Sequence, residues 1–137
     1  MKHTLRFRVY LSDDVASEAW RHIDILRQIR NHAVRDYYRS DYNNRPSDYD
    51  QHNTLTDWTE RWSIFAEPSQ HAAQQAISQI HSDLVTLQER RNNGSDVGRL
   101  QWQAKGEFRS VSYNQSSRFN VDHNTGDDRF VRLRLEK

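Results

Sequence analysis

The spacing of the apolar residues changes twice along this 137-residue chain, and the two changes limit the possible folds more than any other feature. Between His3 and Leu11 apolar and polar residues alternate, which is typical of a half-buried strand. From residue 13 to residue 87 the apolar residues recur every three or four positions, as they do in amphipathic helices. After Gly98 three segments again have the character of short strands: Glu107–Tyr113, Arg118–Asp122 and Arg129–Leu135.

The first helix has a clear start signal. Ser12 can act as the N-cap, and Asp13 and Asp14 place negative charge at the positive end of the helix dipole. The apolar positions that follow keep helical spacing over about six turns. They are Val15, Ala19, Ile23, Leu26, Ile29, Ala33 and Tyr37.

A second, shorter helix is expected to begin near Thr54, whose hydroxyl can cap the helix while Asp57 lies three residues further on. The polar stretch before it, residues 40–53 with Pro46 inside, predicts a loop. The apolar stripe of this second helix contains Leu55, Trp58, Trp62 and Phe65. We interpret the last three of these, together with Trp20, as part of a helical core.

A third helix is expected after Pro68, because the first turn of a helix tolerates proline. Its apolar face runs as far as Leu87, and Asn92-Asn93-Gly94 is a typical C-terminal stop. The order is therefore strand, three helices and several strands. Since a single first strand is not stable unless it pairs with later ones, we expect a β-barrel or curled sheet with a helical insertion after its first strand.

The composition narrows the possible functions. The chain has no cysteine, so disulfides and thiolate chemistry are excluded. No apolar run approaches the length of a membrane span, which favours a soluble, cytoplasmic protein with no membrane partner. The formal net charge is only +1, but 17 of the 20 basic residues are arginine, whose planar fork suits phosphate and guanine. Codon bias explains the excess of arginine equally well.

Four segments, taken in order, resemble the N-terminal region of TnpB, the OrfB-type accessory transposase and RNA-guided nuclease. They are LRFRVYLSDD, IRNHA, EPSQHAAQQAISQIHSDL and GRLQWQAKGEFRSVSYNQSSRFNV. The resemblance covers nearly the whole chain. It implies an α+β fold: an oligonucleotide-binding-like β-barrel (the wedge domain), formed by residues 1–11 and 98–137, and interrupted by a three-helix recognition insertion at 12–97.

The resemblance also implies a function. In the family these two parts hold the scaffold of a guide RNA and read a short target-adjacent motif on duplex DNA, without a cofactor. Cleavage belongs to a RuvC-like nuclease domain with three metal-binding carboxylates, for which we find no room before Lys137. The chain also departs from the family pattern in its basic segment. Leu100, Trp102 and Gln103 replace the usual proline, phenylalanine and first lysine, and only Lys105 matches.

The third helix carries unusually many uncharged amides near its start. Ser69 and the free backbone N–H groups beside it suit a phosphate. Gln70 and Gln74, with Gln75, have the paired donor and acceptor groups that contact adenine in a major groove. We predict that this face reads DNA bases. The alternative is that glutamine, a good helix former, simply covers a solvated face.

Cations and aromatic rings on the strands form a second group of candidates, of the kind that binds RNA or single strands. The predicted contacts are Arg6, Arg8, Tyr10, Lys105, Arg109 and Tyr113, with Trp102 and Phe108 as further aromatic rings. Asn31 is a candidate DNA contact by its position in the family, although an asparagine among packing residues can equally satisfy a carbonyl. For the arginines of the first helix, Arg27 and Arg35, a surface ion pair is the favoured interpretation.

Independent catalysis is not expected. His71 and His81 lie about 15 Å apart by helical rise, too far to share a metal ion, and the paired aspartates are explained by capping and turns. We expect structured guide RNA and duplex DNA as partners, with a missing nuclease domain or partner chain completing the assembly. The alternatives are a DNA-binding regulator that acts without RNA, and a folded transposase remnant without activity.

Overall fold

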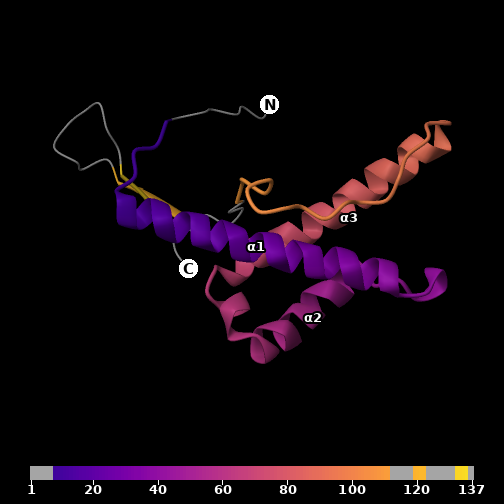
Figure 1. The fold of residues 1–137 in the computed structure, drawn as a ribbon, viewed down its shortest axis with the longest axis horizontal. Coiled ribbons are helices and arrows are strands. Elements are labelled where there is room, and N and C mark those ends of the chain that lie inside the picture. The colour runs from indigo at the N-terminus through magenta and orange to yellow at the C-terminus, as the bar shows by residue number, and fades with distance from the viewer. Residues whose placement is uncertain (1–7, 112–118, 123–131, 136–137) are drawn as a thin grey trace.

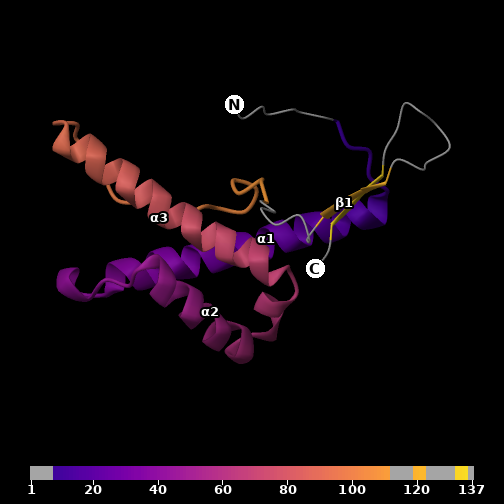
Figure 2. The ribbon, with the colours of Figure 1, turned by 180° about the vertical axis from the view of Figure 1, so that it is seen from behind.

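A computed structural model describes residues 8–111, 119–122 and 132–135 (Figures 1 and 2). Three long helices dominate the described part. The elements are α1 (Asp13–Arg39), the 3-10 turn η1 (Tyr42–Asn44), α2 (Asp48–Arg61), the 3-10 turn η2 (Ser63–Ala66), α3 (Gln70–Asn92), β1 (Phe119–Asp122) and β2 (Arg132–Leu135). Helix α3 packs against both α1 and α2, and α1 also contacts η2.

The predicted start of α1 is confirmed. Ser12 is the N-cap, its hydroxyl accepts from the backbone N–H of Val15, and Asp13 and Asp14 occupy the first turn. At the other end, Ser40 closes the helix because both its backbone N–H and its hydroxyl donate to the Asp36 carbonyl. Residues with short polar side chains thus set both ends of α1.

The prediction for the second helix was wrong at its N-terminus. Helix α2 begins at Asp48, six residues before Thr54, inside the stretch expected to be a loop. Ser47 and Asp50 form a capping box: the Ser47 hydroxyl accepts from the Asp50 N–H, and the Asp50 carboxylate accepts from the Ser47 N–H. This box satisfies two backbone donors and caps the helix at Ser47 rather than at Thr54. The Thr54 hydroxyl lies inside the helix and donates to the Asp50 carbonyl.

The predicted end of α3 is confirmed. The helix ends at Asn92, and Gly94 follows with a positive φ of 87°. There the N–H groups of Gly94 and Ser95 donate to the carbonyls of Arg91 and Arg90. Glycine adopts this left-handed conformation without the steric cost that a β-carbon brings.

The core lies where α1, α2, η2 and α3 meet. Its members are Ile25, Leu26, Ile29, Ala33, Val34, Leu55, Trp58, Phe65, Ala72, Ala73, Ile77 and Ile80. Trp58 and Phe65 are buried as expected, and Trp62 is half-buried against them. The prediction for Trp20 was wrong, because this ring is 57% exposed. The apolar stripe of α1 extends to Trp20, but the described residues provide no element that buries the Trp20 ring.

A buried amide joins the three helices. The Gln51 side chain of α2 is 1% exposed, and its Nε2 donates to the Ala33 carbonyl of α1 over 2.8 Å. Its Oε1 accepts from Nε2 of His81 in α3 over 2.7 Å. Because both ends of the amide are satisfied, this polar group specifies the packing of the helices without an unpaired group in the core.

The predicted oligonucleotide-binding-like β-barrel is contradicted. Residues 8–11, the described part of the expected first strand, are not a strand, and residues 107–111 form a turn and irregular chain. Among the described residues, only β1 and β2 pair, antiparallel, with Phe119 opposite Leu135 and Asp122 opposite Arg132. These two strands agree with two of the predicted segments. The residues between them lie outside the described part of the chain, and two strands do not close a barrel.

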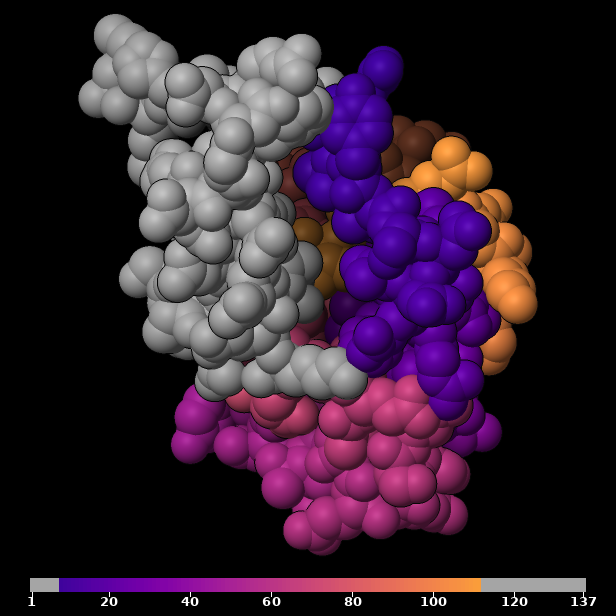
Figure 3. Space-filling view, turned by 90° about the vertical axis from the view of Figure 1, so that its left-hand side faces the viewer, coloured from indigo at the N-terminus to yellow at the C-terminus, as the bar shows by residue number. Residues whose placement is uncertain are grey.

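The alternating apolar residues after Gly98 have a different role from the one predicted. Leu100, Phe108 and Val111 pack against the helical core. The segment 98–111 lies along α1 at the molecular surface (Figure 3). Alternation indicates burial on one side, and the helices provide that burial in place of a sheet.

No helix in the described part of the chain combines the length and the apolar character needed to cross a membrane.

Candidate nucleic-acid interface

Hydrogen bonds from α1 hold the extended segment 98–111 in place. The carboxamide of Asn31 makes two of them: Nδ2 donates to the Gln103 carbonyl over 3.0 Å, and Oδ1 accepts from the Gln103 N–H over 3.1 Å. Arg30 donates to the Gln101 carbonyl, and the Tyr38 hydroxyl accepts from the Leu100 N–H. The segment therefore gains partners for its backbone without belonging to a sheet.

This arrangement leaves the ring of Trp102 on the outside. The residue is 63% exposed, and hollows lie on both sides of it. The larger hollow is a groove of about 530 Å³ between α1 and the segment, bordered by Arg27, Gln28 and Arg35. The other hollow is bordered by Arg109 and Gly106.

We use the name Trp102 surface for this ring, the cations that border its two hollows and the lysine of the same segment: Arg27, Arg35, Trp102, Lys105 and Arg109. Lys105 and Arg109 are exposed. Lys105 is close enough to contribute to a lower pKa of the Asp24 carboxyl, although the hydrogen bond from Arg27 is the main cause of that shift. Lys105 and Arg109 were both predicted as nucleic-acid contacts; Arg109 borders the second hollow beside Trp102, and Lys105 lies in the same segment between them.

Arg27 contributes less free charge than its exposure suggests. Its Nε donates to the Asp24 carboxylate over 2.9 Å, and its Nη1 donates to the Gln103 carbonyl over 3.1 Å. Because the pKa of Asp24 is lowered, that carboxyl stays ionised and compensates the arginine. The prediction of an ion pair is confirmed for Arg27. It is wrong for Arg35, which donates to His32 and forms no ion pair with a described residue. The cations of the surface without such an ion pair are Arg35, Lys105 and Arg109.

Two buried polar atoms that border the groove have no hydrogen-bond partner among the described residues. They are the donor Nε of Arg35 and the acceptor Oε1 of Gln103. Nη2 of Arg35 donates to Nδ1 of His32 over 2.9 Å, so His32 is neutral with its other nitrogen protonated. Burial lowers the pKa of His32 and favours the same state. Nε of Arg35 and Oε1 of Gln103 are both enclosed at the wall of the groove.

In the sequence, Gln103 was noted only because it replaces the first lysine of the family's basic segment. The structure shows that its backbone anchors the segment to Asn31 and that its side-chain oxygen borders the groove. The position of Gln103 next to the aromatic Trp102, in a segment rich in amides, was the available signal.

The remaining predicted contacts are dispersed. Arg6 and Tyr113 lie outside the described residues, while Arg8 and Tyr10 are exposed in the chain before α1. The Asn31 side chain binds backbone, as the alternative interpretation held, and is only 7% exposed.

Of the three contacts predicted near the start of α3, two are accessible to solvent. Gln70 is exposed and Gln74 half-buried, whereas Ser69 is 3% exposed. The Ser69 hydroxyl makes no cap hydrogen bond, and burial of its side chain does not favour a contact with phosphate.

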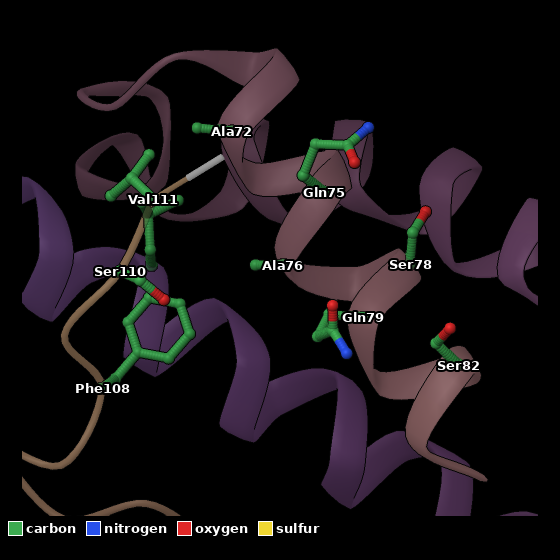
Figure 4. A pocket seen from close by; sticks show the side chains of 10 residues that line it. Ala72, Gln75, Ala76, Ser78, Gln79, Ser82, Phe108, Ser110 and Val111 are labelled. Carbon is green, nitrogen blue, oxygen red and sulfur yellow. The ribbon is translucent and has the colours of Figure 1, made fainter. Parts of the chain in front are cut away.

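Further polar side chains of α3 border a cavity beside the segment 98–111. Gln79, Ser78 and Ser82 border a cavity of about 340 Å³ whose opposite wall contains Phe108 and Ser110 (Figure 4). Gln79 donates to Asp83 on its own helix. This cavity is neither strongly charged nor aromatic enough to suggest a ligand.

No group of three or more His, Asp or Glu side chains in the described residues has an arrangement that could hold a metal ion. Comparison of the chain with protein-family models, with curated proteins and with solved structures found no match. The resemblance to TnpB therefore rests on the sequence motifs alone.

Proposed function

We propose that this chain is a nucleic-acid-binding module that takes single-stranded or looped RNA on its Trp102 surface. The observation that carries the proposal is an exposed indole ring, 63% accessible, that borders two hollows, one of them also bordered by Arg35 and the other by Arg109. A base can stack on Trp102 beside Arg35 and Gln103 in the groove. Arg109, which borders the second hollow, and Lys105, in the same segment, can then contact the neighbouring phosphates.

Unpaired RNA fits this surface better than a duplex does. Stacking on an indole requires a base whose face is free, and bases inside a duplex are already stacked on each other. The charge also favours a limited contact, because the chain has a net charge of only +1 and Arg27 is compensated by Asp24. We expect a footprint of a few nucleotides rather than a long track.

The resemblance to TnpB supports a more specific partner. In that family the corresponding region holds the scaffold of a guide RNA, and we propose that the RNA bound here is a structured transcript encoded next to this gene. A nuclease domain or a partner chain is then needed for any cleavage. The alternative is a regulator that binds DNA without RNA.

Contact with DNA is a second candidate function, and Gln70 is the observation that favours it. Its amide is exposed in the first turn of α3, and that turn contains no carboxylate to repel phosphate. If α3 reads bases, Gln70→Ala reduces the preference for one duplex sequence by about 1–3 kcal/mol and leaves RNA affinity unchanged. If the sequence preference is the same in Gln70→Ala as in the wild type, Gln70 does not read bases.

The proposal is tested by equilibrium binding of fluorescent single-stranded RNA and of the neighbouring transcript to the purified chain. Trp102→Ala removes the stacking ring and is expected to raise the Kd about tenfold. The matched control is Trp20→Ala, which removes an equally exposed ring from α1, about two turns before Arg27. If both variants bind like the wild type, or both lose affinity equally, the Trp102 surface is not the RNA site.

A further inference from the structure

A second cluster of aromatic and cationic side chains lies at the C-terminal end of α1. The guanidinium carbon of Arg45 lies 5.0 Å from the ring centroid of Tyr37, 5.5 Å from that of Tyr38 and 5.1 Å from that of Tyr42. The rings of Tyr37 and Tyr38 are nearly perpendicular, at 88°. Tyr42 is 80% exposed, so one ring of the cluster remains open to solvent.

The cluster forms one wall of a cleft of about 600 Å³. Helices α1 and α3 diverge toward these ends (Figures 1 and 2), and the last turns of α3 supply the opposite wall. Arg91 of α3 borders the cleft, and Arg99, from the segment after α3, lies over the Tyr38 ring at 5.1 Å. We call this site the Tyr–Arg cleft: Tyr37, Tyr38, Tyr42, Arg45, Arg91 and Arg99.

The charge of the cleft is uncompensated. Arg45, Arg91 and Arg99 all border it, and no carboxylate is among the described residues that line it. None of the three forms an ion pair with a described residue. Nε of Arg45 is enclosed and has no hydrogen-bond partner among the described residues. Since arginine stays charged in proteins, three guanidinium groups around one cleft attract an anion.

The arrangement also restricts the kind of anion. The tyrosine rings already surround a cation of the protein itself, so a cationic ligand is repelled although the site is aromatic. Guanidinium forks bind phosphate oxygens in pairs, and the open face of Tyr42 offers a surface for a flat ring. A ligand that carries both a phosphate and a flat aromatic ring satisfies both walls at once.

We propose that the Tyr–Arg cleft binds one nucleotide unit, with its base stacked on Tyr42 and its phosphate held by Arg45, Arg91 and Arg99. The unit is either a free nucleotide or one residue of an RNA strand. The Tyr38 hydroxyl accepts from the Leu100 N–H, two residues from Trp102, so an RNA strand on the Trp102 surface passes close to the cleft. Binding of a free nucleotide does not depend on the function proposed above.

The test is isothermal titration calorimetry of the full chain with AMP, adenosine, inorganic phosphate and a five-nucleotide oligoadenylate. We expect AMP or the oligonucleotide to bind more tightly than adenosine or phosphate alone. Arg91→Gln and Tyr42→Ala change exposed residues and leave the core intact. Each is expected to weaken binding about tenfold, whereas Tyr42→Phe keeps the ring and the affinity. Arg90→Gln is the matched control, because Arg90 is the neighbouring exposed arginine of α3 and does not border the cleft.

The results separate the two sources of the nucleotide. Equal affinity for AMP and the oligonucleotide indicates a free nucleotide, and much tighter binding of the oligonucleotide indicates RNA. The proposal is overturned if neither ligand binds, if polyglutamate binds as well as AMP, or if either Arg91→Gln or Tyr42→Ala binds like the Arg90→Gln control. Trp102→Ala must leave AMP affinity unchanged, so failure of the Trp102 surface and failure of the cleft are distinguishable.

Discussion

Asn31 holds the centre of the segment 98–111 through a single carboxamide that bonds to both backbone groups of Gln103. Replacing it with alanine leaves a donor and an acceptor without partners in a partly buried place. We expect Asn31→Ala to lower the free energy of unfolding by about 2 kcal/mol. Urea titration measures this loss, and hydrogen exchange at the Gln103 amide is expected to accelerate by more than the global change explains.

The control for Asn31 is Gln28→Ala, one turn earlier on the same helix. The Gln28 amide donates to Asp24 and forms no hydrogen bond with the segment, so its loss is expected to change stability by no more than a few tenths of a kcal/mol. If Asn31→Ala is as stable as Gln28→Ala, the carboxamide does not anchor the segment.

Two half-buried histidines predict how stability depends on pH. Burial lowers the pKa of His32, which lies among Trp62 and Phe65, and of His81, which donates to Gln51. Above a pH of about 6.5 both imidazoles are neutral in the folded and the unfolded chain. Below it the unfolded chain takes up protons first, so the free energy of unfolding falls until the lowered folded pKa is reached.

We therefore expect a lower urea midpoint at pH about 5.5 than at pH about 7.5, and a smaller drop for His32→Phe, which cannot be protonated. If the urea midpoint stays constant or rises on acidification, His32 and His81 are not neutral, half-buried imidazoles in the folded chain.

The residue that caps α2 decides where this element begins. Ser47→Ala removes the acceptor for the Asp50 N–H and is expected to destabilise the protein by about 1 kcal/mol. Thr54→Ala removes only a bond to the carbonyl one turn earlier and is expected to cost a few tenths of a kcal/mol at most. Thermal unfolding of the two variants compares these effects, and a larger loss for Thr54→Ala places the helix start where the sequence alone suggested it.

The elements differ in how far the sequence predicts them, for local reasons. The ends of α1 and α3 depend on Ser12 and Gly94, whose chemistry acts within one turn and is visible in the sequence. The start of α2 was predicted wrongly because the polar stretch around Pro46, which contains the capping box, is also typical of a loop. The prediction of a strand at residues 107–113 was wrong in the described part, because apolar alternation does not reveal whether a sheet or a helical layer covers the apolar side.

The candidate site was predictable only in part. Lys105, Arg109 and Trp102 belong to one short segment, so the sequence places them near each other. Arg35 joins them because Asn31 fixes the segment against α1, and that long-range contact has no local signal. The Tyr–Arg cleft was missed for the same reason, since Arg91 and Arg99 meet the tyrosines of α1 only after the three helices have packed.

At the scale of the whole molecule, the small net charge predicts a modest electrostatic contribution to RNA binding. Three free cations on the Trp102 surface correspond to a slope of log Kobs against log salt of about −2 for a single strand. Lys105→Gln is expected to reduce the magnitude of that slope by about 0.7, and Glu89→Gln on the exposed part of α3 is the control away from this surface. A slope near zero excludes phosphate contacts, and one much steeper requires cations beyond those of the Trp102 surface.

The location of bound RNA tests the central claim most directly. Ultraviolet cross-linking of a short single-stranded RNA to the chain, followed by mass spectrometry of the peptides, identifies the residues in contact. The account predicts cross-links in residues 99–109, with Trp102 foremost, and their loss in Trp102→Ala but not in Trp20→Ala. Cross-links confined to α2 and η2, with none in residues 99–109, contradict it.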